Sequence, residues 1–340
     1  MNYAIEEYVF NDYNASSKAR KDVSHFVNQF GFRTLIKNDK SKNKNSKFTK
    51  ILKALHVFTK VFLLGSNDVL FLQTSHLLLK PILHIKKIRK FKVIYLIHDV
   101  FSLRFNTEMS IQEHKEDILR DIQILNECDC VIAHNQLMIN RLRQLGCKTQ
   151  LISLGIFDYD CNLPAKKRTW HSKEDLTITF AGNISKSPFL DQMDKNAPNF
   201  QMNIYGAPKK QFQHLNYKGC VDADLLPNAI EGHLGLIWEG DYKSKIEDNY
   251  NEINNPHKLS MYIVSGLPII AFKGTAAGKF IEKEGIGLTI YSLDDLGQTI
   301  TQISETQYQS MAENCLRLRE KLTQGYFLQT ALTNSLKLLS

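Results

Sequence analysis

Asn254-Asn255-Pro256-His257-Lys258 is the stretch whose residue types best suit binding chemistry, because it precedes a segment with helical character. Asn254 or Asn255 is a suitable N-cap, and Pro256 fits the first helical position, where a missing N–H is no loss. The free amides and positive dipole end of such a helix suit a phosphate group. Lys258 is unfavourable there unless an anion lies beside it, so we expect an anion site. The alternative is a capped helix with a solvent-exposed lysine.

Other polar loops follow predicted strands in the second half of the chain. Gly182 would let a ligand approach the backbone closely, and Trp238 offers an aromatic face. For these loops the alternative is ordinary turn or capping chemistry. The candidates at these strand ends are Gly182, Asn183, Ser185, Lys186, Trp238, Glu239 and Asp241.

The first half has two comparable loops. His98 and Asp99 end a strongly apolar predicted strand. The loop that joins the first strand to its helix combines hydroxyl, amide and basic side chains, again with turn chemistry as the alternative. Its candidates are Asp12, Asn14, Ser16, Ser17, Lys18 and Arg20.

Two further patterns carry little weight. Asp222-Ala223-Asp224 has the DxD spacing of metal-dependent sugar transfer, but its surroundings are typical of a capped helix entry. The histidines lack the spacing of metal ligands, and the sequence has no P-loop, GxGxxG or GxSxG motif. We therefore expect no metal site, and no NTPase, dinucleotide-dependent dehydrogenase or hydrolase.

Alternating strands and helices must position these loops. Strands are predicted at 3–10, 32–36, 68–73, 92–99, 129–134, 148–153, 176–183, 200–206, 233–240, 267–272 and 286–291, and first-half helices at 15–30, 47–63, 77–89, 111–127 and 136–145. Such alternation predicts α/β domains with parallel sheets, whose ligands lie outside the carboxyl ends of the strands. We expect two doubly wound, Rossmann-like domains, 1–155 and 176–324, joined by a linker at 156–175 and facing across a cleft.

Composition narrows the class of protein. The 340 residues suffice for two domains, and the net charge of +8 favours an anionic partner. Six cysteines lack zinc or disulfide spacing, and neither a signal peptide nor a membrane span is evident, so we expect a cytoplasmic protein. Eight lysines at 37–60 could place the N-terminal half on the inner face of a membrane, although a crossover helix with a lysine-rich face is the simpler interpretation.

Seven segments together resemble the bacterial β-1,6-galactofuranosyltransferases and the related nucleotide-sugar glucosyltransferases of streptococcal adhesin glycosylation. They are FNDYNASSKARKD (10–22), IYLIHDVFSLR (94–104), CDCVIAHNQLM (128–138), IFDY (156–159), FAGNIS (180–185), GLIWEGD (235–241) and NNPHKLSMYI (254–263). The galactofuranosyl branch is the more similar, chiefly through NNPHK and KARKD.

The resemblance implies the GT-B fold, with a UDP-sugar held mainly by the second domain and no metal or other cofactor at the diphosphate. It also implies that 325–340 crosses back to the first domain, and that the protein is a homo-oligomer. The glutamate pair of retaining members is missing, with Ile253 and Met261 at the corresponding positions, which favours an inverting reaction.

The resemblance also suggests roles. Lys258 and the helix amides would hold the diphosphate, helped by Lys186 or Arg20. Asp99 is the expected general base, with Asp12 and Glu239 as rivals and His98 orienting it or contacting sugar. The donor pocket would be shaped by Asn183, Tyr205, Trp238 and Asp241.

The expected reaction is transfer of galactofuranose from UDP-galactofuranose to a glycan acceptor in cell-surface polysaccharide synthesis. We expect this acceptor glycan to be lipid-linked. One alternative is a UDP-glucose-dependent enzyme acting on a serine-rich adhesin. The alternative of another class is a nucleotide- or nucleic-acid-binding protein without transfer activity, which would interleave basic residues with exposed aromatics along one groove.

Overall fold

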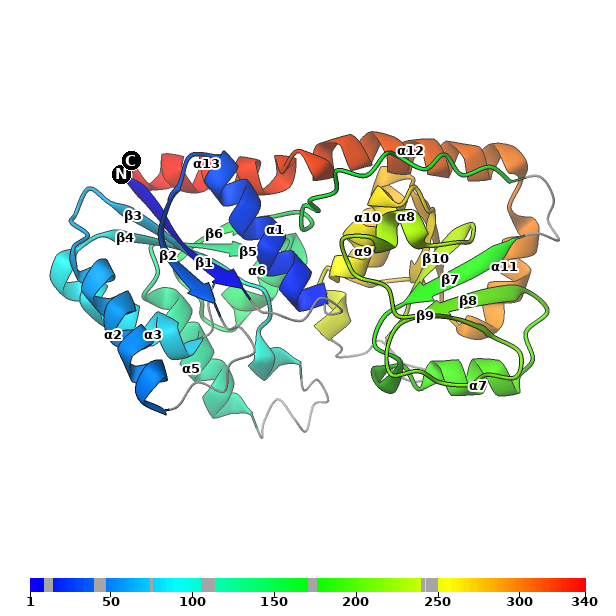
Figure 1. Ribbon diagram of the computed structural model, residues 1–340, viewed down its shortest axis with the longest axis horizontal. Coiled ribbons are helices and arrows are strands. Elements are labelled where there is room, and N and C mark those ends of the chain that lie inside the picture. Colours follow the sequence, from blue (N-terminus) through cyan, green and yellow to red (C-terminus); the bar gives the residue numbers. More distant parts are fainter. Residues whose placement is uncertain are drawn as a thin grey trace.

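The computed structural model contains two parallel six-stranded sheets (Figure 1). It describes residues 1–340 except 9–14, 40–46, 74–75, 105–113, 171–175, 240–241 and 243–249. The first sheet has the order β2-β1-β3-β4-β5-β6. Its elements are β1 (Asn2–Tyr8), α1 (Ala15–Gln29), β2 (Arg33–Asp39), α2 (Lys47–Phe62), β3 (Val69–Leu72), α3 (His76–Arg89), β4 (Lys92–Leu96), η1 (Phe101–Leu103), α5 (Lys115–Asn126), β5 (Cys130–Ala133), α6 (Gln136–Gln144) and β6 (Gln150–Ser153).

The second sheet has the order β12-β11-β10-β7-β8-β9. Its elements are β7 (Thr177–Ala181), η3 (Ile184–Lys186), α7 (Phe189–Lys195), β8 (Gln201–Tyr205), β9 (Asn216–Gly219), α8 (Leu226–Ala229), β10 (Leu234–Ile237), η4 (Tyr250–Glu252), α9 (His257–Val264), β11 (Ile269–Phe272), α10 (Ala276–Glu284), β12 (Gly287–Ile290), η5 (Leu293–Asp295), α11 (Leu296–Gln302) and α12 (Glu305–Thr323). α13 (Tyr326–Leu339) follows.

The predicted fold class is confirmed, and each predicted strand is present within a few residues of its expected bounds. β9 is the strand that the sequence pattern missed. Its residues, Asn-Tyr-Lys-Gly, form no apolar run because β9 is an edge strand and none of its side chains is fully buried.

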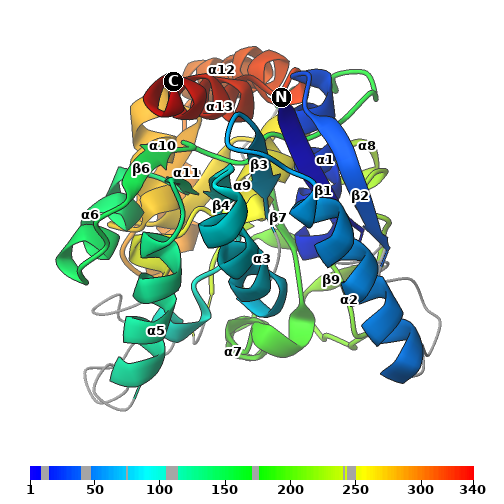
Figure 2. The same cartoon turned by 90° about the vertical axis from the view of Figure 1, so that its left-hand side faces the viewer.

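Helices cover both faces of the first sheet. α2, α3, α5 and α6 contribute to the core on one face, and α1 and α13 to the core on the other. α12 runs along the second domain and α13 continues over the first (Figures 1 and 2). Leu328 and Leu332 of α13 pack with Val23 and Phe26 of α1. The C-terminal helix therefore belongs structurally to the first domain.

The segment before α9 also joins the two domains. Tyr250 and Ile253 are buried in the core of the first domain, although they precede a helix of the second. Asn135, the N-cap of α6 just after β5, donates a hydrogen bond from Nδ2 to the Ile253 carbonyl at 2.9 Å. This packing positions the start of α9 against the strand ends of the first sheet. None of the described helices has the length and apolar character needed to cross a bilayer.

Candidate active site between the domains

The first turn of α9 is the centre of the candidate site. α9 begins at His257, and Pro256 is its N-cap residue, in an extended conformation with φ −69° and ψ 144°. The predicted asparagine cap is therefore wrong, and Pro256 precedes the helix. Asn255 instead ties this segment to the first domain: Nδ2 donates to the Gly155 carbonyl at 2.5 Å, and its backbone amide faces His134 Nδ1 at 3.4 Å.

Lys258 points from this turn toward the end of β7. Its Nζ lies over the Phe180 ring, 4.5 Å from the centroid. A Cβ placed on Gly182 would be 2.9 Å from both Cε and Nζ of Lys258, so a larger residue at 182 would displace the end of this side chain. Burial lowers the pKa of Lys258, while the nearby Glu239 carboxylate opposes that shift. The ammonium group makes no hydrogen bond or ion pair with any residue that the structure describes.

The loop after β7 lies beside this lysine. The Gly182 amide donates to the Tyr205 carbonyl at 3.0 Å, and the Asn183 side chain accepts a hydrogen bond from the Lys186 amide at 3.2 Å. Asn183 thus caps η3, while Ser185 and Lys186 are exposed. A Cβ on Gly206 would lie 1.9 Å from the Gly182 carbonyl oxygen, so a glycine at 206 is needed to fix this loop.

The loop after β4 supplies a carboxyl group from the first domain. Arg104 Nη2 lies 3.4 Å from Asp99 Oδ1, and Asp99 is 24% exposed. Burial raises the pKa of Asp99; the positive charges of Arg104 and Arg20 oppose that rise, and Glu239 adds to it. The positive charge of Lys186, in the second domain, also lowers the pKa of Asp99. Predicted residues from both domains are therefore close enough to influence one another electrostatically.

His98 and Arg20 lie together behind this loop. His98 Nε2 is 2.7 Å from Gln73 Oε1, and its ring stacks on Phe157 with centroids 5.2 Å apart. Arg20 donates to the Gln73 carbonyl, and Gln73 Nε2 donates back to the Arg20 carbonyl at 3.1 Å. Burial first, then the charge of Arg20, holds the pKa of His98 well below its ordinary value. His98 is therefore neutral and suits orientation rather than proton transfer near neutral pH.

Several contributors were not predicted. Arg104 lowers the pKa of Asp99, and Gln73 hydrogen-bonds to both His98 and Arg20. The Tyr250 hydroxyl accepts a hydrogen bond from the Val100 amide at 3.0 Å. Arg104 also lies over the Tyr250 ring, 5.7 Å from its centroid. Arg104 was within reach of sequence reasoning, because it follows Asp99 by five residues in the same quoted motif. Gln73 and Tyr250 carry no such signal.

Other predicted side chains make different contacts. The Tyr205 hydroxyl accepts from the Glu231 amide at 3.1 Å, on the side of the 229–231 turn. Trp238 is only 2% exposed and packs on Phe272, so it presents no open aromatic face. Ser17 is buried and Ser16 is exposed. Asp12, Asn14 and Asp241 lie outside the described residues.

Lys18 makes a contact between the domains instead of lining an open loop. Its Nζ lies 2.5 Å from Asp22 Oδ1 and 2.9 Å from Asp224 Oδ1 of the second domain. Lys21 also pairs with Asp224, at 2.5 Å. The DxD carboxylate at 224 thus has lysine partners. In the described ranges, no three His, Cys, Asp or Glu side chains are grouped as metal ligands.

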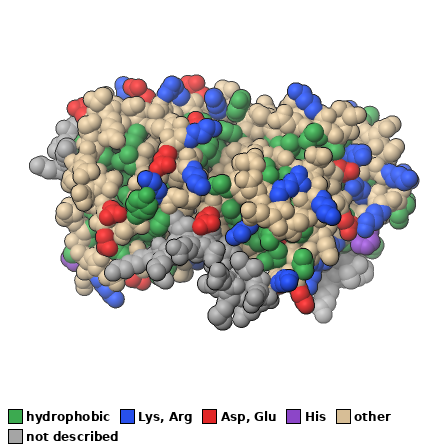
Figure 3. All heavy atoms as spheres, turned by 180° about the vertical axis from the view of Figure 1, so that it is seen from behind, with side chains coloured by type: hydrophobic (Ala, Val, Ile, Leu, Met, Phe, Trp, Pro, Cys, Tyr) green, Lys and Arg blue, Asp and Glu red, His purple; other side chains and the backbone are tan. Residues whose placement is uncertain are grey.

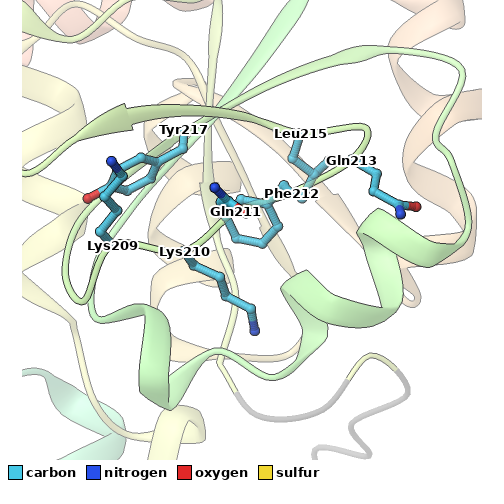
Figure 4. Close-up of a pocket in the computed structure, with 7 residues that line it drawn as sticks. All are labelled: Lys209, Lys210, Gln211, Phe212, Gln213, Leu215 and Tyr217. Atoms are coloured by element: carbon cyan, nitrogen blue, oxygen red, sulfur yellow. The ribbon is translucent and has the colours of Figure 1, made fainter.

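A separate surface pocket lies on the loop between β8 and β9 (Figure 4). Lys210, one of its lining residues, pairs with Asp191 of α7 and lies 5.9 Å from the Phe212 ring centroid. The lining contains no predicted site residue, and no carboxylate or histidine that could act as a base. It consists of Lys209, Lys210, Gln211, Phe212, Gln213, Leu215 and Tyr217.

The fold and the facing strand ends are those of the GT-B class of glycosyltransferases. HepE of Anabaena, solved in complex with UDP and glucose, superposes with a TM-score of 0.63 at 13% identity, covering 99% of each chain. The lipopolysaccharide outer core galactosyltransferase WaaB superposes with a TM-score of 0.61 at 11% identity, again covering 99% of each chain.

Sequence comparison defines the family. The glucosyltransferase 3-like N-terminal domain matches residues 2–156, and the glucosyltransferase 3-like C-terminal domain matches 178–335. The chain therefore belongs to the glucosyltransferase 3-like family, and it is a glycosyltransferase.

Two curated relatives are similar over most of the chain. Beta-1,6-galactofuranosyltransferase WbbI of Escherichia coli is 25% identical over 342 residues, covering 97% of each chain. Glucosyltransferase 3 of Streptococcus parasanguinis is 26% identical over 251 residues, covering 73% of this chain and 71% of its own.

Proposed function

We propose that the protein is a metal-independent, inverting glycosyltransferase that moves galactofuranose from UDP-galactofuranose to a glycan acceptor. The observation that carries this proposal is the half-buried ammonium of Lys258, held over Phe180 beside Gly182 without an ion-pair partner among the described residues. The free amides of the first turn of α9 lie at the positive end of the helix dipole, so both favour an anion there. Together they provide positive charge for a diphosphate where other enzymes use a divalent cation.

In the proposed reaction Asp99 acts as the general base. Its carboxylate takes the proton of the acceptor hydroxyl, the acceptor oxygen bonds to the anomeric carbon, and the bond from that carbon to the diphosphate oxygen breaks. UDP leaves with the bonding electron pair, and Lys258 and the α9 amides stabilise its charge. Ile253 and Met261 are buried and apolar, so neither supplies the carboxylate of a retaining mechanism.

The identity of the donor rests on similarity. The galactofuranosyltransferase relative matches over 97% of both chains, and the structural neighbour HepE has been solved with UDP-glucose. The alternative donor is UDP-glucose, which the glucosyltransferase 3-like family description favours.

A panel of UDP-sugars with excess EDTA tests the proposal. We expect UDP release from UDP-galactofuranose in the presence of a glycan acceptor and without added metal. Turnover of UDP-glucose alone would support the alternative donor. Loss of activity on chelation would contradict metal independence, and retention of DNA or RNA without any turnover would indicate a binding protein instead.

Replacement of Lys258 by alanine tests the role of the ammonium group. We expect UDP affinity and turnover to fall by about 100-fold, because a charge-assisted contact to the diphosphate is lost. Lys321→Ala is the matched control, since Lys321 also stacks on an aromatic ring, Tyr326 at 5.3 Å, but is exposed on α12. Near-normal kinetics for Lys258→Ala would remove the proposed role.

We also propose that the acceptor is lipid-linked and that the first domain contacts anionic lipid. Lys and Arg side chains are spread over the surface of both domains (Figure 3), and in the first domain Phe62, Leu63 and Ile88 are 48%, 74% and 69% exposed. Arg89 lies over the Phe62 ring at 5.2 Å, so basic and apolar groups adjoin.

Leu63→Asp with Ile88→Asp should abolish sedimentation with phosphatidylglycerol vesicles, whereas Leu225→Asp, at a 57% exposed site of the second domain, should not. Equal sedimentation of all variants would contradict lipid contact.

A further inference from the structure

Two buried polar atoms face each other across the domain boundary without hydrogen-bond partners in the described structure. They are Asp22 Oδ2, on α1 of the first domain, and His257 Nε2, on α9 of the second. The distance between them is 3.9 Å, and the side chains are 0% and 9% exposed. Unpaired buried polar atoms are rare because they lose their water without gaining a partner. The pair therefore calls for a physical explanation.

Both side chains are held by other contacts. The His257 ring stacks on Tyr159 with centroids 5.0 Å apart and an interplanar angle of 24°. Asp22 Oδ1 accepts a hydrogen bond from Lys18 Nζ at 2.5 Å, which leaves Oδ2 directed elsewhere. Burial keeps the imidazole of His257 neutral by lowering its pKa to about 3. A neutral imidazole with its proton on Nε2 can donate to Asp22 Oδ2.

A small movement is enough to make this bond. A hydrogen bond needs about 2.9 Å between the two atoms, so α9 must approach α1 by about 1 Å. α9 packs in the core of the second domain through Leu259 and Tyr262, so closure of the domains would carry it toward α1. The same approach carries the neighbouring Lys258 toward the first domain, where α1 also bears Arg20.

We propose that Asp22 and His257 are positioning residues, and that they form a hydrogen bond when the domains close on the donor. The bond fixes the first turn of α9, with Lys258, against the domain that carries Asp99. Neither residue touches the reacting atoms. This inference rests on the proposed function, because it assumes that a donor diphosphate occupies the first turn of α9.

Kinetics of His257 variants test the inference. For His257→Ala we expect turnover to fall about 10-fold. The UDP dissociation constant should rise far less than the about 100-fold expected for Lys258→Ala, because the lost bond supports closure while the charge contact is kept. His257→Gln should restore turnover to within about 3-fold of the parent, since its Nε2 donor can reach a similar position. His84→Ala is the control, because His84 is exposed on α3, where its Nδ1 lies 2.9 Å from the Lys80 carbonyl oxygen.

A double-mutant cycle isolates the pair. In an Asp22→Ala background Lys18 keeps Asp224 as a partner, and His257→Ala should then cause no further loss of turnover. Additive losses, or a His257→Ala variant with normal turnover, would overturn the inference. A His257→Ala variant that loses UDP affinity as Lys258→Ala does would also overturn it, by showing direct donor contact.

The parent protein separates this inference from the proposed function. If the parent turns over no UDP-sugar, the proposed function fails. If the parent is active and the His257 variants behave as the control does, only the positioning role fails. Should Asp22→Ala not fold, the comparison of His257→Ala with His257→Gln still decides, because a requirement for packing alone would not be met by a smaller, flexible amide in a stacked site.

Discussion

The carboxylate of Asp99 and the guanidinium of Arg104 lie 3.4 Å apart on the loop after β4. Two opposing effects meet at this carboxyl group. Burial raises the pKa of Asp99, and Arg104 is the largest influence that lowers it again. A general base works best when its pKa is near the working pH while most of it remains ionised. The pair therefore suits proton removal from an acceptor hydroxyl.

Asp99→Asn should remove the base while keeping the shape of the loop. We expect turnover to fall by about 100-fold or more, with UDP affinity nearly unchanged. Steady-state kinetics and calorimetric titration with UDP measure the two quantities. Asp117→Asn, in an exposed pair with Arg120 on α5, serves as the control. An Asp99→Asn enzyme with full turnover would leave Glu239 or Asp12 as the base.

Arg104→Ala should move the acid limb of the pH–rate profile to higher pH. Arg104 lowers the pKa of Asp99, so its removal lets that pKa rise, and the ionised base is then lost at a higher pH as the solution is acidified. Turnover measured from pH 5 to 9 checks the direction. Arg120→Ala should leave the profile in place, and a shift toward lower pH in Arg104→Ala would contradict the assignment.

Gly206→Ala should damage the loop after β7. Gly206 has φ +147°, and a Cβ there would lie 1.9 Å from the Gly182 carbonyl oxygen. We expect a loss of about 3 kcal/mol in the free energy of unfolding and weaker UDP binding. Gly219→Ala measures the cost of backbone strain without a steric clash, because Gly219 has φ +97° but no atom within 4 Å of the added Cβ. Its expected loss is about 1–2 kcal/mol, measured by denaturant titration.

His134 should make stability fall on acidification. Burial lowers the pKa of His134 from 6.5 to about 4, while Nε2 contacts the Ile97 carbonyl at 3.1 Å. Between pH 6.5 and about 4, His134 takes up a proton in the unfolded chain but not in the folded chain. Its contribution to the free energy of unfolding is therefore fully present above pH 6.5 and is lost as the pH falls toward 4. The contribution of this one group is about 1.4 kcal/mol per pH unit at most. His134→Gln should show a slope smaller by one proton in the same denaturant series, and an unchanged slope would contradict this assignment.

The alternation of strands and helices, and the loops that follow β4 and β7, were predictable from the sequence because local apolar period and glycine placement carry that information. β9 was not, since an edge strand needs no apolar run. The sequence also indicated Lys258, because a lysine at a helix start is locally unfavourable. The positions of the Trp238 and Tyr205 side chains could not be predicted, because an aromatic residue at a strand end has the same local sequence pattern whether it faces a ligand or the core.

The sequence by itself determined two doubly wound domains and the polar loops at their strand ends, because these follow from contacts between residues near one another in the chain. Tertiary structure decided which of those loops meet. Tyr250 enters the core of the first domain, Lys18 reaches Asp224, and His257 comes to face Asp22. These contacts join residues more than 100 positions apart, and they depend on the angle at which one sheet packs beside the other, which no local pattern specifies.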